Sequence, residues 1–364
     1  MTNLKNKLSG YYKKLIQKFF KYLYGEINEK VSHKENKDII LSSTSIEKNN
    51  YNIYICKTCS LYTDTIHDTA IIKNRKIVEG PSFQLRNNIN SDCINNSVIT
   101  KGTPRFRKNI KGKVLSLLTG GGGNSNYWHW MFDVLPRLNI IKKKELAFNF
   151  YLFPDLNQKF QNETLDLLQI SKSKRLSSRS LRHFYADEIV VTSHPYTILN
   201  DPSIDSLKIP NWISEFLRIK FLEIGKKNSK MENLPEKIFI NRNDGRSLRY
   251  IINNNQVENL LKERGFKSLT MSNFSFVDQV VLFNHAKKII GLHGAAFANI
   301  VFCKPKTKII EMRPDTAGNV IKNLALSNNL NYFDITSKPK TINFNNQQGD
   351  IEINMDLLNQ IINS

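Results

Sequence analysis

The C-terminal half of the chain, from residue 237 onward, alternates short apolar runs rich in β-branched residues with windows of helical periodicity. The expected strands are 237–241, 267–271, 288–292 and 307–312, and the expected helices are 255–264, 275–286 and 295–302. Such alternation favours a parallel sheet with helices on both faces. Ligands of these sheets bind beyond the carboxyl ends of the strands, where strand-to-helix turns converge.

The clearest local motif follows the third of these strands, where His293, Gly294 and Ala295 join strand to helix. Gly294 permits a tight turn close to a ligand, and small residues open the next helix. The free N–H groups and the dipole of a helix start favour an anion. The motif predicts a diphosphate-binding turn. The alternative is a turn that only lets a helix pack tightly on the sheet.

Charged residues stand beside this turn in the expected sheet. Arg242 and Arg246 follow the first strand, and guanidinium groups suit bidentate contact with phosphate oxygens. Alternatively, the two arginines form ion pairs at the protein surface. Glu311 ends the fourth strand, where its carboxylate can accept hydrogen bonds from ribose hydroxyls or pair with Arg313.

A second glycine-rich turn is expected in the N-terminal half. Residues 114–118 have the pattern of a buried strand, Gly120 to Gly123 follow, and a helix is expected from about residue 125 or 126. Such a loop can hold a dinucleotide. This one departs from G-x-G-x-x-G, and no acidic residue stands at a suitable distance at a strand end, so a dehydrogenase is disfavoured.

The helix after this loop predicts a histidine and carboxylate pair. His129 and Asp133 are four residues apart and share a helix face, with Asn126 and Arg137 one turn beyond each end. Pro136 should end or kink the helix just after Asp133. The pair is a candidate general base, and a helix-face ion pair or a buried core histidine is the alternative.

The same helix carries two tryptophans, Trp128 and Trp130. Their flat rings can stack on sugars, and buried core aromatics have the same sequence pattern.

The N-terminal segment is basic. Residues 1–25 contain six lysines and no acidic residue, and apolar side chains recur at steps of three and four. This pattern predicts an amphipathic helix that lies on an anionic membrane or packs on the domain with a solvated lysine face. Residues 31–50 and 226–235 have the composition of linkers. The expected parts are therefore 1–36, 37–230 and 231–364, with short strands beginning near residue 37.

Composition narrows the class of protein. A chain of 364 residues favours two domains, and no apolar run approaches the roughly 20 residues of a membrane span. The net charge is +21, but the sequence has neither a helix-turn-helix nor an RNP-type pattern, so no nucleic acid is expected. Cys56 and Cys59 form one CxxC without two further zinc ligands, which predicts reduced thiols and no metal. We expect a cytoplasmic protein, peripheral at the inner face of the membrane if the helix binds lipid.

Several motifs agree in order and spacing across about residues 110–315. They consist of Asn126, His129, Trp130, Asp133, Leu135, Pro136 and Arg137, then Arg242, Arg246, Gln279, Phe283, Ala286, Gly291, His293, Gly294, Ala295, Asn299, Ile310 and Glu311. In these residues the chain resembles glycosyltransferase family 61. One departure is Phe297, where relatives often carry a smaller residue nearby; we expect its ring to pack under the helix.

The resemblance implies an α/β fold of GT-B type, in which two Rossmann-like domains face a cleft. It implies an inverting transferase that uses a UDP-sugar without an essential metal or other cofactor, with a glycan acceptor. The expected donor-binding residues are Arg242, Arg246, His293, Gly294, Ala295, Asn299 and Glu311. Asn126, Trp130 and Arg137 are expected at the acceptor or as support.

For the reaction, Asp133 is the first choice of general base, with His129 as its partner or substitute, and His293 is expected to donate a hydrogen bond to the leaving phosphate. The bacterial-looking composition points to surface polysaccharide assembly. The competing hypothesis is a basic module without enzymatic activity that binds nucleic acid or an anionic polymer.

Overall fold

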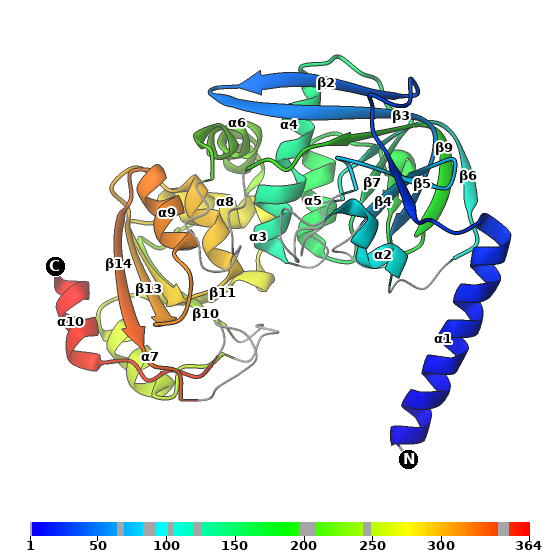
Figure 1. Cartoon of the computed structure of the whole chain (residues 1–364). Coiled ribbons are helices and arrows are strands. Elements are labelled where there is room, and N and C mark those ends of the chain that lie inside the picture. Colours follow the sequence, from blue (N-terminus) through cyan, green and yellow to red (C-terminus); the bar gives the residue numbers. More distant parts are fainter. Residues whose placement is uncertain are drawn as a thin grey trace. The chain divides into compact units, whose positions relative to one another are not determined.

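The computed structural model describes residues 2–63, 69–82, 92–100, 105–118, 126–196, 209–242, 249–340 and 349–364. The chain is a mixed α/β protein, as expected from the sequence (Figure 1). It divides into two compact units. The first comprises residues 1–161 and 169–195, and the second comprises residues 162–168 and 196–364.

The first unit contains a nine-stranded sheet in the order β1-β5-β4-β3-β9-β6-β7-β8, with β2 paired to β3. Its elements are α1 Thr2–Tyr24, β1 Glu29–Val31, β2 Ile39–Ile46, β3 Asn49–Thr63, β4 Thr69–Lys73, β5 Lys76–Val78, η1 Cys93–Asn95, α2 Ser97–Thr100, β6 Lys108–Ser116, α3 Tyr127–His129, the π-helical turn η2 Trp130–Val134, α4 Pro136–Lys142, β7 Phe150–Phe153, α5 Lys159–Leu167, η3 Lys172–Lys174, β8 Arg175–Ser177 and β9 His183–Thr192. Residues 162–168, which include most of α5, belong to the second unit.

The parallel part of this sheet has the order of half a Rossmann fold. Strands β8, β7, β6 and β9 lie side by side and parallel, which in chain order is 3-2-1-4. The direction of winding reverses between β6 and β9, so the crevice for a ligand is expected beyond the carboxyl ends of these two strands. The chain after β6 leads to His129 and Asp133, and the chain after β9 leads to His194.

The antiparallel part of the sheet differs from the sequence prediction. The linker predicted for residues 31–50 is wrong for Ile39–Ile46, which forms β2 and pairs along its length with β3. The strands expected to begin near residue 37 are confirmed in part: β2 begins at Ile39, but β3 runs for 15 residues rather than being short. The cause is tertiary: β3 pairs with β2, β4 and β9, and these ladders satisfy the backbone of a polar segment that has weak strand preference by itself.

The paired thiols belong to the core of the first unit. The β3–β9 ladder is interrupted at Thr58, whose φ is +50°, and Cys56 and Cys59 on either side of it belong to the same apolar cluster. Both are free and fully buried, which confirms the predicted buried thiols. In the described part of the chain, no three His, Cys, Asp or Glu side chains gather as a metal-binding group.

The second unit contains five parallel strands in the order β11-β10-β12-β13-β14. Its elements are α6 Asn211–Asn228, β10 Lys237–Asn241, α7 Asn254–Glu263, β11 Lys267–Thr270, η4 Met271–Asn273, α8 Phe276–His285, β12 Lys288–Leu292, η5 Ala295–Phe302, β13 Lys308–Pro314, α9 Val320–Ser327, β14 Asn331–Ser337 and α10 Met355–Asn363. The seven elements predicted between residues 237 and 312 are confirmed within two residues at each end. Only the helix at 295–302 differs, because it is a 3-10 helix.

The strand order of this sheet, 2-1-3-4-5 in chain order, also has a reversal. It lies between β10 and β12, where successive connections pass to opposite sides. A ligand is therefore expected beyond the carboxyl ends of these two strands. Arg242 follows the first of them and His293 follows the second.

Helix α6 belongs to the second unit by its contacts. The Phe221 ring lies 4.9 Å from that of Phe276, and α6 passes so close to α8 that a Cβ on Gly225 would lie 2.8 Å from Val280. The compact units therefore divide near residue 195, whereas the domain boundary predicted at residue 230 stays a prediction. None of the described helices is both long enough and apolar enough to cross a membrane.

Candidate functional site

In the second unit, the turn after β12 is held by two arginines at the reversal of the sheet. Arg242 Nη1 donates a hydrogen bond of 2.8 Å to the carbonyl oxygen of His293, and the Arg249 guanidinium donates to the same oxygen. The His293 N–H donates to the carbonyl of Met312 at 2.8 Å, which fixes the turn to β13. Gly294 and Ala295, next along the chain, are partly exposed, so their backbone is accessible to a ligand.

Glycines make this arrangement possible. A Cβ on Gly294 would collide with the guanidinium of Arg242, so only glycine allows the arginine to lie across the turn. At Gly291 a Cβ would lie 3.0 Å from that of Ile240 and 3.4 Å from the ring of Phe297. Phe297 is fully buried, which confirms that its ring packs under the helix.

Arg249 is a residue that sequence analysis missed. It is 5% exposed, and its Nε is buried without a hydrogen-bond partner in the described residues. Burial, and then the positive charge of Arg242, lower its pKa to about 10, while Glu311 opposes the shift. Two guanidinium groups crowded at one carbonyl make the turn electropositive, which suits a phosphate. The run of arginines at 242, 246 and 249 was the available signal. Arg246 itself lies outside the described residues.

Glu311 holds His293 rather than pairing with Arg313. Glu311 lies on β13, opposite Gly291 of β12. Its fully buried carboxylate accepts a hydrogen bond from Nδ1 of His293. Its second oxygen accepts a hydrogen bond of 2.6 Å from the hydroxyl of Tyr332 on β14. Burial, together with the charge of Glu311, raises the pKa of Tyr332. Arg313 pairs with Asp334 instead, at 3.0 Å.

Asn299 and Gln279 lie behind the turn. Asn299 is fully buried, and its Nδ2 donates to Oε1 of Gln279 at 2.8 Å. The amide nitrogen of Gln279 donates in turn to the carbonyl of Met271 at 3.0 Å. These bonds tie η5 to α8 and η4, so the structure shows Asn299 in a supporting network.

In the first unit, the helix after β6 begins and bends as the sequence predicts. The side chain of Asn126 caps it by accepting a hydrogen bond of 2.9 Å from the N–H of Trp128. The next turn is π-helical, because the N–H of Leu135 bonds the carbonyl of Trp130 at 3.1 Å. Pro136 then opens α4. Such π-helical turns occur frequently at functional sites.

His129 and Asp133 meet as predicted. Nδ1 of His129 lies 2.7 Å from Oδ2 of Asp133, and Nε2 of His194 lies 3.8 Å from the same oxygen. Asp133 is fully buried, whereas the side chain of His129 is 31% exposed. The pair therefore stands at the reversal between β6 and β9, with its histidine toward solvent.

The two groups shift one another's pKa in opposite directions. Burial acts to raise the pKa of Asp133, but the charge and hydrogen bond of His129, and then those of His194, hold it far below its usual range. Burial acts to lower the pKa of His129, but the charge and hydrogen bond of Asp133 outweigh it and raise that pKa. The carboxylate stays ionised, and the histidine is the group that titrates.

Arg137 and Trp130 support this pair from within the core. Arg137 is fully buried; its Nε donates to the carbonyl of Asp133 and its Nη1 to that of Thr192, each at 3.0 Å. These bonds join the π-helical turn to the end of β9. Trp130 is also fully buried, with its ring centroid 5.9 Å from that of Phe153. It has no face open to a sugar, so support is the role that the structure favours.

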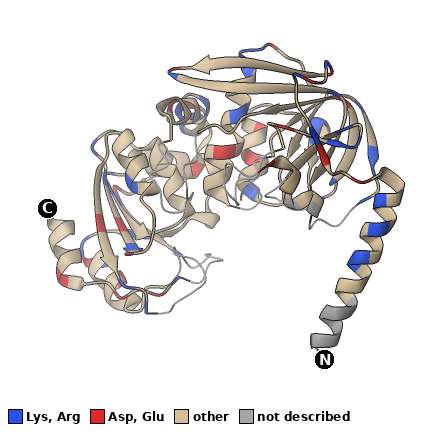
Figure 2. Ribbon diagram, in the orientation of Figure 1, with Lys and Arg blue, Asp and Glu red and all other residues tan. Residues whose placement is uncertain are grey.

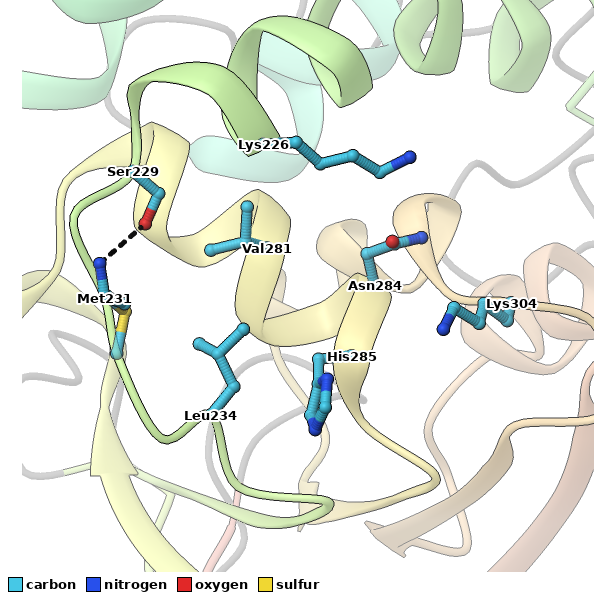
Figure 3. Close-up of a pocket in the computed structure, with 8 residues that line it drawn as sticks. All are labelled: Lys226, Ser229, Met231, Leu234, Val281, Asn284, His285 and Lys304. Atoms are coloured by element: carbon cyan, nitrogen blue, oxygen red, sulfur yellow. Dashed lines mark hydrogen bonds between the residues drawn. The ribbon is translucent and has the colours of Figure 1, made fainter.

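A pocket of about 200 Å³ in the second unit lies at the opposite edge of the sheet (Figure 3). His285 ends α8 just before β12 begins, and Lys304 lies between η5 and β13, so these residues mark the amino ends of the strands. Figure 3 shows Lys226 from the end of α6 on the same pocket. Because ligands of parallel sheets bind at carboxyl ends, this pocket is not the candidate donor site.

Comparison with known proteins identifies the family of the chain. The family model described as Glycosyltransferase 61 matches residues 127–310, just over half of the chain. The match begins at the first helical residue after Asn126 and ends one residue before Glu311. No curated protein matches the chain. Membership in an enzyme family favours a transferase over the basic binding module. The chain belongs to glycosyltransferase family 61 and is a glycosyltransferase.

Proposed function

We propose that the chain is an inverting transferase that takes its sugar from a nucleotide donor, and that the donor diphosphate binds at the turn after β12. The observation that carries this proposal is the convergence of Arg242 and Arg249 on the carbonyl of His293, beside the accessible backbone of Gly294. Fixed guanidinium groups beside free N–H groups are what a diphosphate needs. Arg246 and Ala295 complete the proposed donor site.

His293 assists the leaving group in this proposal. Glu311 accepts a hydrogen bond from Nδ1, so the other ring nitrogen, Nε2, remains for a phosphate oxygen and donates a hydrogen bond to it when both ring nitrogens carry a proton. Glu311 is then a positioning residue for His293, a different role from the ribose contact that the sequence suggests. Positioned arginines stabilise the charge that develops on the leaving diphosphate, so we propose that no metal ion or other cofactor is required.

The base in this proposal is His129, held by Asp133. An acceptor hydroxyl must lose its proton as it attacks the anomeric carbon, and direct displacement with inversion needs one base for this step. The buried carboxylate of Asp133 is bound to His129 and has a low pKa, so it is a weak base. His129 is partly exposed, and its pKa is raised from the ordinary value, so it binds a proton more strongly.

The finer identity of the reaction belongs to the same proposal. We propose uridine diphosphate as the carrier, a glycan as the acceptor, and surface polysaccharide synthesis on the cytoplasmic side of a membrane as the setting. We also propose the GT-B arrangement of two Rossmann-like domains that the family resemblance implies. The composition and the basic N-terminal helix support this setting.

Calorimetric titration tests the donor site. Wild type is titrated with UDP and a panel of UDP-sugars, with and without chelator, and Arg242→Gln is compared with the charge-matched control Lys111→Gln on the exposed part of β6. We expect binding that survives chelator and weakens by about tenfold or more in Arg242→Gln, because a charge-assisted hydrogen bond is lost. Lys111→Gln should bind like wild type. Absence of nucleotide binding in every condition would remove the basis of the proposal.

Helix α1 supports the peripheral membrane location. Four described lysines of this helix, Lys13, Lys14, Lys18 and Lys21, have no acidic neighbour within it (Figure 2). Its exposed apolar side chains are Tyr11, Tyr12, Leu15, Phe19, Tyr22 and Leu23. Phe20 is buried, with its ring centroid 5.0 Å from that of Phe106. One face thus packs on the first unit, and we propose that the other lies on an anionic bilayer.

Vesicle sedimentation tests this location. The triple variant Tyr11→Ser, Leu15→Ser, Tyr22→Ser is compared with Ile219→Ser, Leu326→Ser, which removes exposed apolar side chains from α6 and α9. Wild type and the second variant should sediment with anionic vesicles, and the triple variant should not. Equal sedimentation of all three, or concentration-dependent dimers of wild type that the triple variant lacks, would assign the face to another partner.

A further inference from the structure

A cavity of about 790 Å³ lies in the first unit, beneath the C-terminal half of α1. Its walls come from the inner face of α1, from strands β3, β4 and β9, and from the short helices η1 and α2. The volume is within the range of small-molecule sites in proteins.

The cavity is separate from the His129 and Asp133 pair. It is lined by His183 and Tyr185 at the amino end of β9, whereas the pair lies beyond the carboxyl end of the same strand. At about 3.3 Å per residue, Tyr185 and Thr192 are more than about 20 Å apart along the strand. A ligand in this cavity is therefore not the sugar that reacts at His129.

The charge of the lining is one-sided. Lys21, Arg75, Arg107 and His183 line the cavity, and none of its lining residues that the structure describes is an Asp or Glu. Lys21 pairs with Glu26 at 2.6 Å, but neither Arg75 nor Arg107 forms an ion pair within the described residues. Cations that face a partly enclosed space without carboxylates attract an anion.

Two aromatic rings contact the guanidinium of Arg107, an exposed residue at the cavity wall. The Arg107 guanidinium carbon lies 5.5 Å from the ring centroid of Tyr24 and 5.7 Å from that of Tyr185. The hydroxyl of Tyr24 also accepts a hydrogen bond of 2.9 Å from the backbone N–H of Arg107. Burial, and then the positive charge of Arg107, lower the pKa of His183, as expected where positive charges crowd. The guanidinium is thus oriented before any ligand arrives.

The rest of the lining suits sugar hydroxyls. Amide side chains of Asn28, Asn74 and Asn95 line the cavity together with hydroxyl groups of β3, and tyrosine rings offer flat apolar faces. Hydroxyl-rich rings bind where such amides and aromatic faces occur together. A purely apolar ligand would make no use of the amides of Asn28 and Asn74, and a bare inorganic ion would leave most of the volume unused.

We propose that this cavity binds a saccharide that carries a phosphate or carboxylate group, with Arg107 and Arg75 on the anionic group. The ligand is either a soluble anionic glycan or the headgroup of an anionic glycolipid. This proposal does not rest on the proposed donor site, because its residues all belong to the first unit and none is shared with the turn after β12.

Titration with small probes tests the proposal. Glucose 6-phosphate, glucuronic acid and glucose are titrated into full-length wild type, Arg107→Gln, Arg75→Gln and the control Lys111→Gln. We expect both anionic sugars to bind at least about tenfold more tightly than glucose, and Arg107→Gln to lose about tenfold while Lys111→Gln loses nothing. Arg107→Lys should restore part of the binding. Arg75 is exposed in the β4–β5 turn, so Arg75→Gln keeps the test valid if Arg107→Gln is unfolded.

A vesicle arm identifies the source of the ligand. Phosphatidylcholine vesicles containing phosphatidylinositol are compared with vesicles containing phosphatidylserine, which has the same net charge and no sugar ring. Stronger binding to phosphatidylinositol that Arg107→Gln abolishes assigns a lipid headgroup, and preference for the soluble probes assigns a free glycan. If the anionic sugars bind no better than glucose and the two vesicles bind equally, the proposal is wrong. UDP affinity, measured in the same variants, should stay unchanged, so failure here is distinct from failure of the donor site.

Discussion

The two units each hold a histidine against a buried carboxylate at the reversal of a parallel sheet, but by different means. His129 and Asp133 are four residues apart on one helical segment, whereas His293 follows β12 and Glu311 lies on the neighbouring strand β13. The His129 side chain is 31% exposed and that of His293 only 5%.

The second residue that contacts each carboxylate also differs. Asp133 faces a second histidine, His194, whereas Glu311 accepts from the hydroxyl of Tyr332. In the proposed reaction, the pair with the more exposed histidine exchanges a proton with the acceptor. The enclosed pair, whose histidine carbonyl is bound by two arginines, holds the donor in that proposal.

The largest effect is expected from removing the exposed histidine. His129→Gln should lower the turnover number by about 10²–10⁴-fold, which is the usual contribution of a general base. UDP affinity, measured by calorimetry, should change by less than about threefold, because the donor residues are in the other unit. His285→Gln, at the amino edge of the second sheet, is the control and should keep full turnover. Turnover of His129→Gln close to wild type would show that the base is another group.

The next effect should come from Asp133→Asn, which removes the charge that raises the pKa of His129. The rate of wild type should rise with pH as His129 loses its proton, with a midpoint above the ordinary value of about 6.5. In Asp133→Asn, burial still lowers the pKa of His129 and the opposing carboxylate is gone. The midpoint of the pH–rate profile should therefore move to lower pH, and turnover should fall about 10²-fold. A pH–rate profile measures both. Asp155→Asn, which removes another ion-paired carboxylate from the first unit, should leave the profile unchanged.

The same pair should make stability depend on pH in two windows. The folded-state pKa of His129 is raised, so its contribution is complete below its unfolded pKa of about 6.5 and is lost as pH rises through the folded pKa. The pKa of Asp133 is lowered, so its contribution is complete above about 3.9 and is lost as pH falls toward the folded value. The free energy of unfolding of wild type should therefore exceed that of Asp133→Asn most at pH values between about 3.9 and about 6.5, as measured by denaturant titration.

The contrast between the pairs explains what sequence could predict. A spacing of four residues on a helix fixes a contact, so His129 and Asp133 could be paired from the sequence alone. The partner of His293 depends on which strands are neighbours and in which register, and Glu311 could be placed only near the site. Tyr332 lies on β14, a strand that the sequence analysis did not identify, so its bond to Glu311 had no signal.

Local patterns also set the limits of the fold prediction. Strands β10 and β12 were predicted at their observed ends, because a fully buried parallel strand is a continuous apolar run between turn residues. Strands were expected to begin near residue 37, but the length and pairing of the β2–β3 hairpin were not predicted, because its polar, half-exposed strands gain their stability from partners distant in the sequence. Arg249 was missed for the same kind of reason, since only the fold brings it to the carbonyl of His293.

In the turn beside His293, Gly294→Ala should have a smaller effect on function than His129→Gln or Asp133→Asn. The added Cβ would collide with the Arg242 guanidinium, which must move away from the carbonyl of His293. UDP affinity should fall about tenfold, because one charge-assisted contact is displaced. Gly10→Ala, where a Cβ meets nothing within 4 Å, is the control and should bind UDP like wild type. Unchanged affinity of Gly294→Ala would place the diphosphate elsewhere.

The smallest effect is expected from Tyr332→Phe, which removes only the hydroxyl that donates to Glu311. One buried carboxylate oxygen then loses its partner, which should lower the free energy of unfolding by about 1–3 kcal/mol in denaturant titration. UDP affinity should fall by only a few fold, because the other oxygen still holds His293. Tyr12→Phe, at an exposed position of α1, should change neither quantity.

Tyr332→Phe also sharpens the comparison between the two units. Its pH–rate midpoint should equal that of wild type, because His129 and Asp133 are untouched in the first unit. A shifted midpoint would mean that the enclosed pair takes part in proton transfer, and the proposed division of roles between a proton-transferring pair and a donor-holding pair would then be wrong.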